Sequence, residues 1–160
     1  MKTYIGTKII QAEPAYRVSN DRAHHIIATD PADAFANYPQ VEEGYRVRYQ
    51  DGYESWSPKD VFERAYLPLH VNPDLKTDRP SVSQKMVDEF ITKTEVTTMG
   101  EKTTVVRAVL RNGFEIVESS SCVSPENYDE ELGAEICLEK IRDKVWFLLG
   151  FLLQTAVYGI

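Results

Sequence analysis

The chain has 160 residues and a formal net charge of −7 at neutral pH, with 42% hydrophobic and 27% charged residues. This is the composition of an ordinary folded protein, and the length fits one medium domain or two small ones. The acidic balance excludes the broad cationic surface that holds a long phosphate backbone, so duplex DNA or RNA is not an expected partner.

The start of the chain and its cysteines indicate the compartment. Met1 to Ile10 lack the unbroken apolar run and the cleavage site of a secretory signal peptide, which predicts a cytoplasmic protein. The two cysteines, Cys122 and Cys137, give neither a disulfide framework nor the ligand spacing of a zinc site. We therefore expect no metal and no cofactor.

Residues 1–67 predict a small module of sheet and helix. The run from Thr3 to Gln11 is rich in Tyr, Ile and Thr, which is typical of a strand. Residues 12–43 lose periodicity and carry three prolines, which predicts a long surface excursion with one short helix at Pro31 to Asn37.

A β-hairpin is predicted between residues 44 and 56, where Asp51-Gly52 is typical of a two-residue turn. This turn pairs Val47 with Trp56 and gives the hairpin one aromatic face. The aromatic residues of the hairpin are Tyr45, Tyr49, Tyr53 and Trp56.

A helix is predicted directly after this hairpin. In the run Ser57-Pro58-Lys59-Asp60 the serine can cap, the proline suits the first helical position and the aspartate can close a capping box. The helix is expected to end near Tyr66, and it completes the first module.

Residues 68–82 have the proline-rich, polar composition of a linker, so a second domain is expected over residues 83–160. It begins with a short amphipathic helix around Met86 and Phe90. Three strands follow, joined by turns at Gly100-Glu101 and at Asn112-Gly113, and they predict a three-stranded antiparallel meander. The predicted strands are Thr94 to Met99, Lys102 to Arg111 and Phe114 to Ser119.

The last 32 residues predict a long helix that Asn127 or Asp129 can cap. One buried stripe is expected at Leu138, Ile141, Val145, Leu148 and Leu152. From Val145 to Leu153 every position is apolar or glycine, which is too short to span a bilayer and too apolar for a single contact surface. We therefore predict an α+β fold that forms a homo-oligomer and has no membrane span.

No catalytic or metal-binding group can be assembled from the sequence. The adjacent histidines His24 and His25 point in divergent directions and have no third ligand nearby. Cys122 lies among serines but lacks the neighbouring base and orienting group that a nucleophile needs. The sequence therefore predicts a binding protein rather than an enzyme.

The second hairpin offers a candidate ligand site. With Asn112-Gly113 as a two-residue turn, Arg107 faces Glu118 and Arg111 faces Phe114 on the same side of the sheet as the pair Val109 and Ile116. One interpretation is a half-solvated face with a cross-strand ion pair of little energetic weight. The other is a ligand face, with the two guanidinium groups on phosphates and the Phe114 ring stacked on a base.

The segment that enters the long helix extends this candidate site. Ser124 and Asn127 offer polar side chains and free backbone N–H groups that can hold an anion, and Tyr128 offers a second ring for a base. The alternative is that Ser124 and Asn127 only cap the helix, since acidic residues crowd its first turn.

Several motifs in order resemble one known family. They are Val109-Leu110-Arg111-Asn112-Gly113-Phe114, Cys122 to Asp129, Gly133, Lys144-Val145-Trp146 and Leu149 to Leu153. Over about residues 83–157 they resemble the gp forty-nine/gene sixty-six family of small tailed-phage accessory proteins, and the front module resembles one found in phage and prophage proteins. Where some relatives read Gly-Glu-Ser, this chain has Glu118-Ser119-Ser120. The resemblance implies a phage or prophage origin and names no reaction.

A functional hypothesis follows by analogy of architecture. Small oligomeric phage proteins with an arginine-bearing pocket are similar in kind to the sponges that sequester nucleotide signals of bacterial immunity, such as the anti-CBASS and anti-Thoeris proteins. The first hypothesis is a protein that sequesters a cyclic oligonucleotide or ADP-ribose-type signal in the host cytoplasm. The alternative is a protein-interaction module of phage host takeover that uses the aromatic hairpin.

Overall fold

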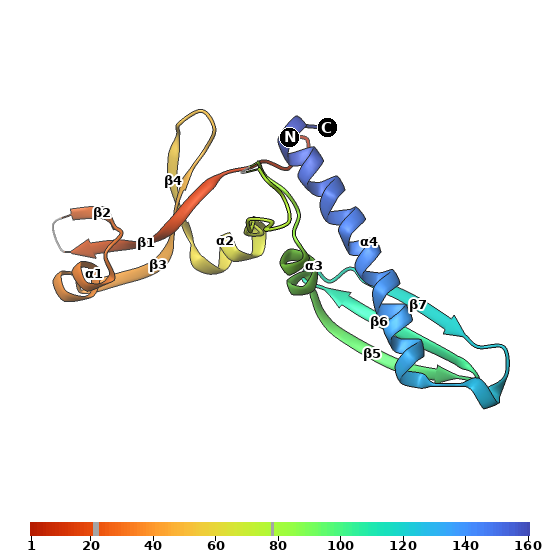
Figure 1. The fold of residues 1–160 in the computed structure, drawn as a ribbon. Coiled ribbons are helices and arrows are strands. Elements are labelled where there is room, and N and C mark those ends of the chain that lie inside the picture. The colour runs from red at the N-terminus through yellow and green to blue at the C-terminus, as the bar shows by residue number, and fades with distance from the viewer. Residues whose placement is uncertain (21–22, 78) are drawn as a thin grey trace. The chain divides into compact units, whose positions relative to one another are not determined.

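The computed structural model describes residues 1–20, 23–77 and 79–160 (Figure 1). The chain divides into two compact units, one of residues 1–68 with the last two residues and one of residues 69–158. Each unit combines an antiparallel sheet with helices, so the predicted α+β class is confirmed. The described residues contain no helix that is long and apolar enough to cross a membrane.

The N-terminal unit is a four-stranded antiparallel sheet in the order β2-β1-β3-β4. Helix α1 connects β2 to β3, and helix α2 follows β4 (Figure 1). The elements are β1 (Gln11–Asn20), β2 (Ala23–Ala28), α1 (Pro31–Asn37), β3 (Gln40–Arg48), β4 (Glu54–Pro58) and α2 (Lys59–Ala65). Helix α1 has the predicted bounds and is capped by the Asp30 carboxylate, which accepts the backbone N–H of Ala32 at 2.8 Å.

The prediction for the first 43 residues is otherwise wrong. Residues 1–10 form no regular secondary structure, while β1 and β2 lie in the segment predicted as a surface excursion. Strand β1 escaped detection because its buried positions, Ala15 and Val18, have an odd spacing that breaks the alternation of a regular strand. Pro14 is tolerated because β2 pairs only from Tyr16 onward, so the proline has a neighbouring strand on one side alone.

The histidine pair of the sequence analysis lies in β2 by its backbone. The side chains of residues 21–26 are outside the described part of the structure. The expectation about His24 and His25 therefore falls outside the described residues.

The predicted register of the first hairpin is wrong by one residue. The backbone N–H of Tyr49 donates to the Tyr53 carbonyl at 2.9 Å, so the loop has three residues, and Gly52 ends it with a φ of 84°. Val47 therefore pairs with Ser55, and Trp56 pairs with Arg46. A turn of this type, with glycine in the left-handed region at its last position, is a common alternative to the two-residue loop.

The predicted cap of α2 is also wrong. Ser57 lies in β4, the N-cap position is Pro58, and no side chain caps this helix end. The strand continues through the segment that resembled a capping box, because Ser57 pairs with Tyr45 and Pro58 with Gly44 in the sheet.

The C-terminal unit is a three-stranded antiparallel meander, β5-β6-β7, with two helices. The meander and the long C-terminal helix are as predicted. The elements are α3 (Gln84–Phe90), β5 (Ile91–Met99), β6 (Thr103–Leu110), β7 (Glu115–Ser121), the 3-10 helix η1 (Pro125–Asn127) and α4 (Glu130–Tyr158). Helix α3 buries Met86, Val87 and Phe90, and described residues 66–77 and 79–83 contain no helix or strand.

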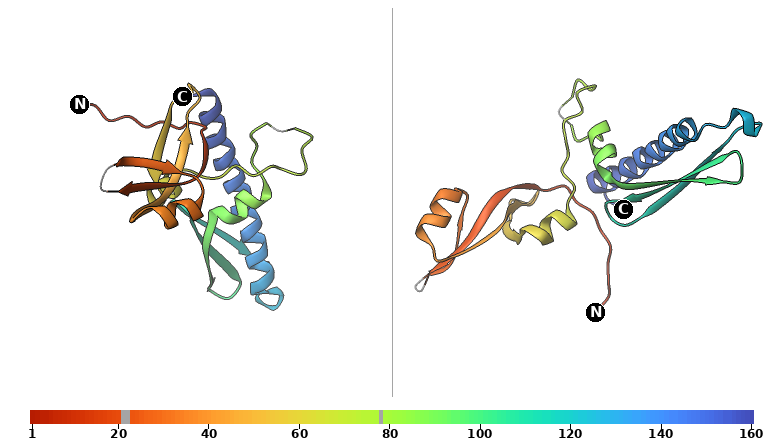
Figure 2. Two further views of the ribbon diagram at one scale, coloured as in Figure 1. Left: turned by 90° about the vertical axis from the view of Figure 1, so that its left-hand side faces the viewer. Right: turned by 90° about the horizontal axis from the view of Figure 1, so that it is seen from below.

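Helix α4 covers one face of this sheet and packs on β6 and β7 (Figure 2). Its fully buried residues recur at every fourth position: Gly133, Cys137, Ile141, Val145 and Leu149. The predicted stripe is therefore only partly right, since Leu148 and Leu152 are 37% and 41% exposed. A step of four residues advances 40° around the helix, so the buried line turns around α4 as it crosses the twisted sheet. Asp129 caps the helix through Leu132, at 3.0 Å, in place of the alternative Asn127.

Candidate functional site

The second hairpin also differs from its predicted register by one residue. The N–H of Leu110 donates to the carbonyl of Phe114 at 2.8 Å, and Gly113 ends a three-residue loop with a φ of 83°. Arg107 pairs with Val117, and Ile116 pairs with Ala108. A slip of one residue moves every side chain of β7 to the opposite face of the sheet. The predicted grouping of Arg107, Glu118 and Ile116 on one face is therefore wrong.

Arg107 forms ion pairs with two carboxylates on the open face of the sheet. Its Nη1 lies 2.7 Å from Glu95 Oε2, and its Nε donates to Glu115 Oε2 at 2.8 Å. These partners raise the pKa of Arg107, with Glu115 the larger cause, and Arg107 lowers the pKa of Glu115. The pKa of Glu95 is lowered first by Lys93 and then by Arg107. The structure matches the ion-pair interpretation of this face, with partners other than Glu118.

Glu118 instead points to the side of the sheet that α4 covers. Its carboxylate pairs with the ammonium of Lys144, and the Glu118 side chain is only 15% exposed. The ammonium of the neighbouring Lys140 bonds the Ser119 carbonyl at 2.9 Å. Through these contacts the two lysines connect the middle of α4 to the edge strand β7.

The six predicted site residues do not form one site within a single chain. Arg111 and Phe114 lie at the β6–β7 turn, where the Arg111 N–H donates to the carbonyl of Phe90 at 2.8 Å. Tyr128 lies at the other end of the sheet, where its hydroxyl bonds Thr98 Oγ1 at 2.7 Å and Thr104 Oγ1 at 3.1 Å. The eight residues of β6 span about 23 Å between these ends. Arg107 lies between them on the open face.

The segment predicted to cradle an anion carries an acidic side chain of its own, Glu126. The pKa of Glu126 is lowered, first by a hydrogen bond from its own backbone N–H and then by one from the Ser124 hydroxyl. The N–H of Asn127 donates to the Ser124 carbonyl at 3.1 Å in η1. The structure thus gives Ser124 and Asn127 local contacts within the turn that leads into α4.

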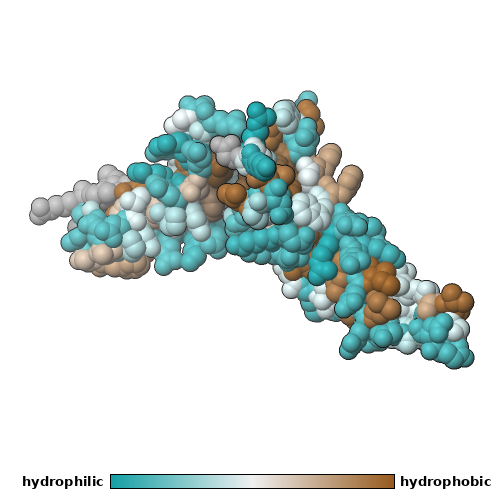
Figure 3. Space-filling model, in the orientation of Figure 1, coloured by the Kyte–Doolittle hydropathy of each residue, from teal (hydrophilic) through white to brown (hydrophobic). Residues whose placement is uncertain are grey.

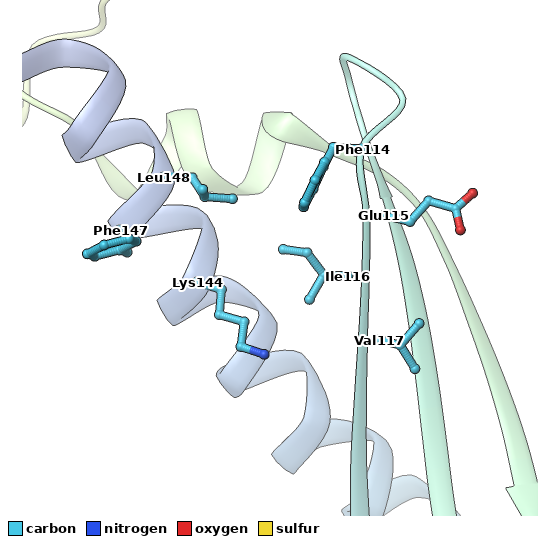
Figure 4. A pocket seen from close by; sticks show the side chains of 7 residues that line it. All are labelled: Phe114, Glu115, Ile116, Val117, Lys144, Phe147 and Leu148. Atoms are coloured by element: carbon cyan, nitrogen blue, oxygen red, sulfur yellow. The ribbon is translucent and has the colours of Figure 1, made fainter. Parts of the chain in front are cut away.

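A shallow groove lies between β7 and the second half of α4, with a volume of about 360 Å³ (Figure 4). Phe114, Ile116 and Leu148 point into the space between strand and helix, while Glu115 and Val117 point away. The lining residues are Phe114, Glu115, Ile116, Val117, Lys144, Phe147 and Leu148. Sequence reasoning missed the groove because the wrong register placed Ile116 on the face of Arg107. The apolar run from Val145 was the one signal that pointed to this part of the helix.

The groove has large apolar side chains that are open to solvent. Phe114 is 57% exposed and Phe147 is 75% exposed. Hydrophobic residues are visible at the surface of the C-terminal unit in Figure 3. Lys144 is the cation of the groove, and Arg111 is exposed at the turn that ends next to Phe114. Among the described residues, no group of three or more His, Cys, Asp or Glu side chains is placed to hold a metal ion.

Comparison with known proteins identifies the part of the chain that carries the groove. Residues 82–157 match the model of the family described as "Phage protein (N4 Gp49/phage Sf6 gene 66) family". No curated protein and no solved structure matches the chain. The matched range runs from the start of α3 almost to the end of α4 and contains every lining residue of the groove. Residues 82–157 of this chain are thus similar to the N4 Gp49/phage Sf6 gene 66 family of phage proteins.

Proposed function

We propose that this phage protein binds a nucleotide second messenger of bacterial defence in the groove between β7 and α4, and sequesters it without cleaving it. The observation that carries the proposal is the exposed ring of Phe114 beside an apolar hollow of about 360 Å³, into which Ile116 and Leu148 also point (Figure 4). A base that stacks on an aromatic ring gains about 1–3 kcal/mol and removes apolar surface from water.

The size of the groove limits what it can hold. A volume of about 360 Å³ is at the lower end for small-molecule sites, so the groove takes one nucleoside of a larger signal and leaves the rest outside. The phosphates then lie near Lys144 and Arg111. Because Lys144 is already paired with Glu118, a phosphate must compete with a carboxylate. We therefore expect the affinity to fall as the salt concentration rises.

This proposal keeps two of the six residues first predicted for the site. Phe114 supplies the ring and Arg111 a cation at the same end of the sheet. Arg107 is left out because both edges of its guanidinium group already bind glutamates. Ser124, Asn127 and Tyr128 are left out because they lie at the other end of β6.

The test is a thermal shift of the full chain with cyclic dinucleotides, cyclic trinucleotides and ADP-ribose derivatives. A ligand at a hundredfold excess over its Kd stabilises the folded state by about 2.7 kcal/mol. Phe114→Leu keeps an apolar side chain but removes the ring, so it should abolish the shift. Tyr53→Leu is the matched control, because Tyr53 is a 65% exposed aromatic residue of the N-terminal unit.

Two results would contradict the proposal. One is a panel that gives no shift with the unchanged chain, and the other is a shift that Phe114→Leu leaves in place. Chromatography of the nucleotide after incubation then checks sequestration, because the signal should be recovered intact. A cleaved product would make the protein an enzyme.

The second candidate is a protein-interaction module of phage host takeover on the aromatic hairpin, and the exposure of Tyr53 favours it. Contacts within the N-terminal unit reduce the aromatic surface of the hairpin that a partner protein could contact. Tyr45 stacks on Phe62 with ring centres 4.1 Å apart, and the guanidinium of Arg17 lies 4.4 Å from the ring centre of Trp56. A host protein that binds the unchanged chain but not Tyr53→Leu would support this candidate.

A further inference from the structure

The second half of α4 has a line of three aromatic residues and one glutamine that the C-terminal unit leaves uncovered. Phe147, Phe151, Gln154 and Tyr158 follow one another at steps of four, three and four residues, which places them on one side of the helix. We call these four residues the outer seam. Leu149, which lies two residues after Phe147 and on the opposite side, is only 3% exposed. Phe147, Phe151 and Tyr158 are 75%, 69% and 76% exposed.

The area of the outer seam is enough for a weak contact between two chains. An aromatic side chain buries on the order of 200 Å², so the exposed parts of three rings offer roughly 400 Å² in each chain. A two-fold contact counts this area twice, which gives roughly 800 Å² in total. This is somewhat below the about 1,000 Å² of a stable specific interface and is the size of a weak association that dissociates on dilution.

The chemistry of the outer seam favours a second copy of the same helix as its partner. Residues 145–160 contain no charged side chain, so any surface that covers them must also be free of charges. The identical helix meets this condition, so the contact would bury no charged side chain without a partner. An antiparallel arrangement also sets the two helix dipoles in opposite directions.

Gly150 gives an independent indication of where the helices would cross. It is exposed beside the outer seam, three residues after Phe147 and four before Gln154, and a Cβ added there would meet no atom within 4 Å. Glycine weakens a helix relative to alanine, and no contact within the chain requires it at this position. The absence of a side chain lets a second helix come closer here than elsewhere along the outer seam.

We propose that two copies of this chain associate through their outer seams, with the α4 helices antiparallel and crossing near Gly150. Phe147 also lines the groove, so the second copy would lie along one rim of it. The association depends on the helix alone and not on the identity of any ligand.

The test is sedimentation equilibrium of the full chain without nucleotide. We expect twice the chain mass of 18.3 kDa, with dissociation on dilution. Phe151→Glu should give the single-chain mass with an unchanged helical circular dichroism spectrum. Leu132→Glu is the matched control, because Leu132 is on the same helix and 56% exposed but lies about 22 Å along the axis from Phe147. This control should remain a dimer.

Cross-linking keeps the proposal testable if Phe151→Glu fails to fold. With Cys122→Ser as background, Gly150→Cys should form a covalent dimer on oxidation, because the crossing brings the two copies of this residue together. Leu132→Cys in the same background should not. An unchanged chain that is monomeric at every concentration, or a dimer that survives Phe151→Glu, would overturn the proposal. Since no nucleotide is present, either result leaves the proposed ligand groove to be judged by its own test.

Discussion

Gly133 is the point of closest approach between α4 and the sheet, and Gly133→Ala tests that packing. A Cβ at this position would lie 2.3 Å from Thr104 Oγ1 and 2.7 Å from Thr104 Cβ. Thr104 is completely buried, and its hydroxyl bonds Tyr128 at 3.1 Å, so it has little room to move. The added methyl group therefore requires the helix and the strand to separate.

Two opposite effects set the size of the change. Alanine in place of glycine within a helix stabilises by about 1 kcal/mol. Forcing an extra carbon into a well-packed contact costs about 1–3 kcal/mol, and disturbing the hydrogen bond to Tyr128 costs about 1 kcal/mol more. We expect a net loss of about 1–3 kcal/mol, which lowers the melting temperature of a unit of this size by roughly 5–20 °C.

Urea unfolding followed by tryptophan fluorescence measures this loss. Each unit has one tryptophan, Trp56 in the first and Trp146 in the second, so a Trp56→Phe background reports on the C-terminal unit alone. Gly150→Ala is the matched control, because its new methyl group meets no atom of the chain. At a concentration where the chain is monomeric, this control should gain about 1 kcal/mol. If Gly133→Ala is as stable as the unchanged chain, α4 does not lie this close to β6.

Three other predictions concern both units. Gly44→Ala should unfold the N-terminal unit more easily, seen in Trp56 fluorescence, because the new Cβ would lie 2.2 Å from a backbone oxygen of the neighbouring strand. Arg107→Gln should leave nucleotide binding unchanged. The two glutamates that pair with Arg107 have lowered pKa values, so these ion pairs stabilise the fold above the ordinary glutamate pKa and lose this effect as the pH falls. Arg107→Gln lacks the ion pairs, so acid should destabilise this variant less than the unchanged chain. Iodoacetamide should label Cys122 before Cys137 in mass spectra, because burial raises the pKa of Cys137.

The sequence determined the outline of the C-terminal unit. Asn112-Gly113 located the second hairpin but not its register, and the apolar repeat from residue 138 onward located the long helix. These features depend on a few neighbouring residues, since glycine has local access to positive φ angles and helical periodicity appears within two turns. The same reasoning found α1 at its observed bounds, and α3 at Met86 and Phe90.

The sequence failed where a strand depends on distant partners. β1 lies between β2 and β3, and its buried positions, Ala15 and Val18, are set by both neighbours rather than by alternation along the strand. The tyrosine and isoleucine side chains of residues 3–10 favour a strand locally, yet Tyr4 and Ile5 are 84% and 89% exposed with no sheet to join. Strand propensity expresses packing on neighbouring strands, so it has little meaning without them.

The candidate site depended on one detail that only the tertiary structure could decide. Asp51-Gly52 and Asn112-Gly113 both suit a two-residue turn, but each glycine ends a three-residue loop in the folded chain. The extra loop residue reverses the facing of the returning strand, so Arg107 meets Glu115 and Ile116 turns toward α4. The turn residues permit either loop, and the choice is made by which face of β7 the long helix covers. The sequence alone therefore established the hairpin and the helix, while the groove between them exists only because the two pack together.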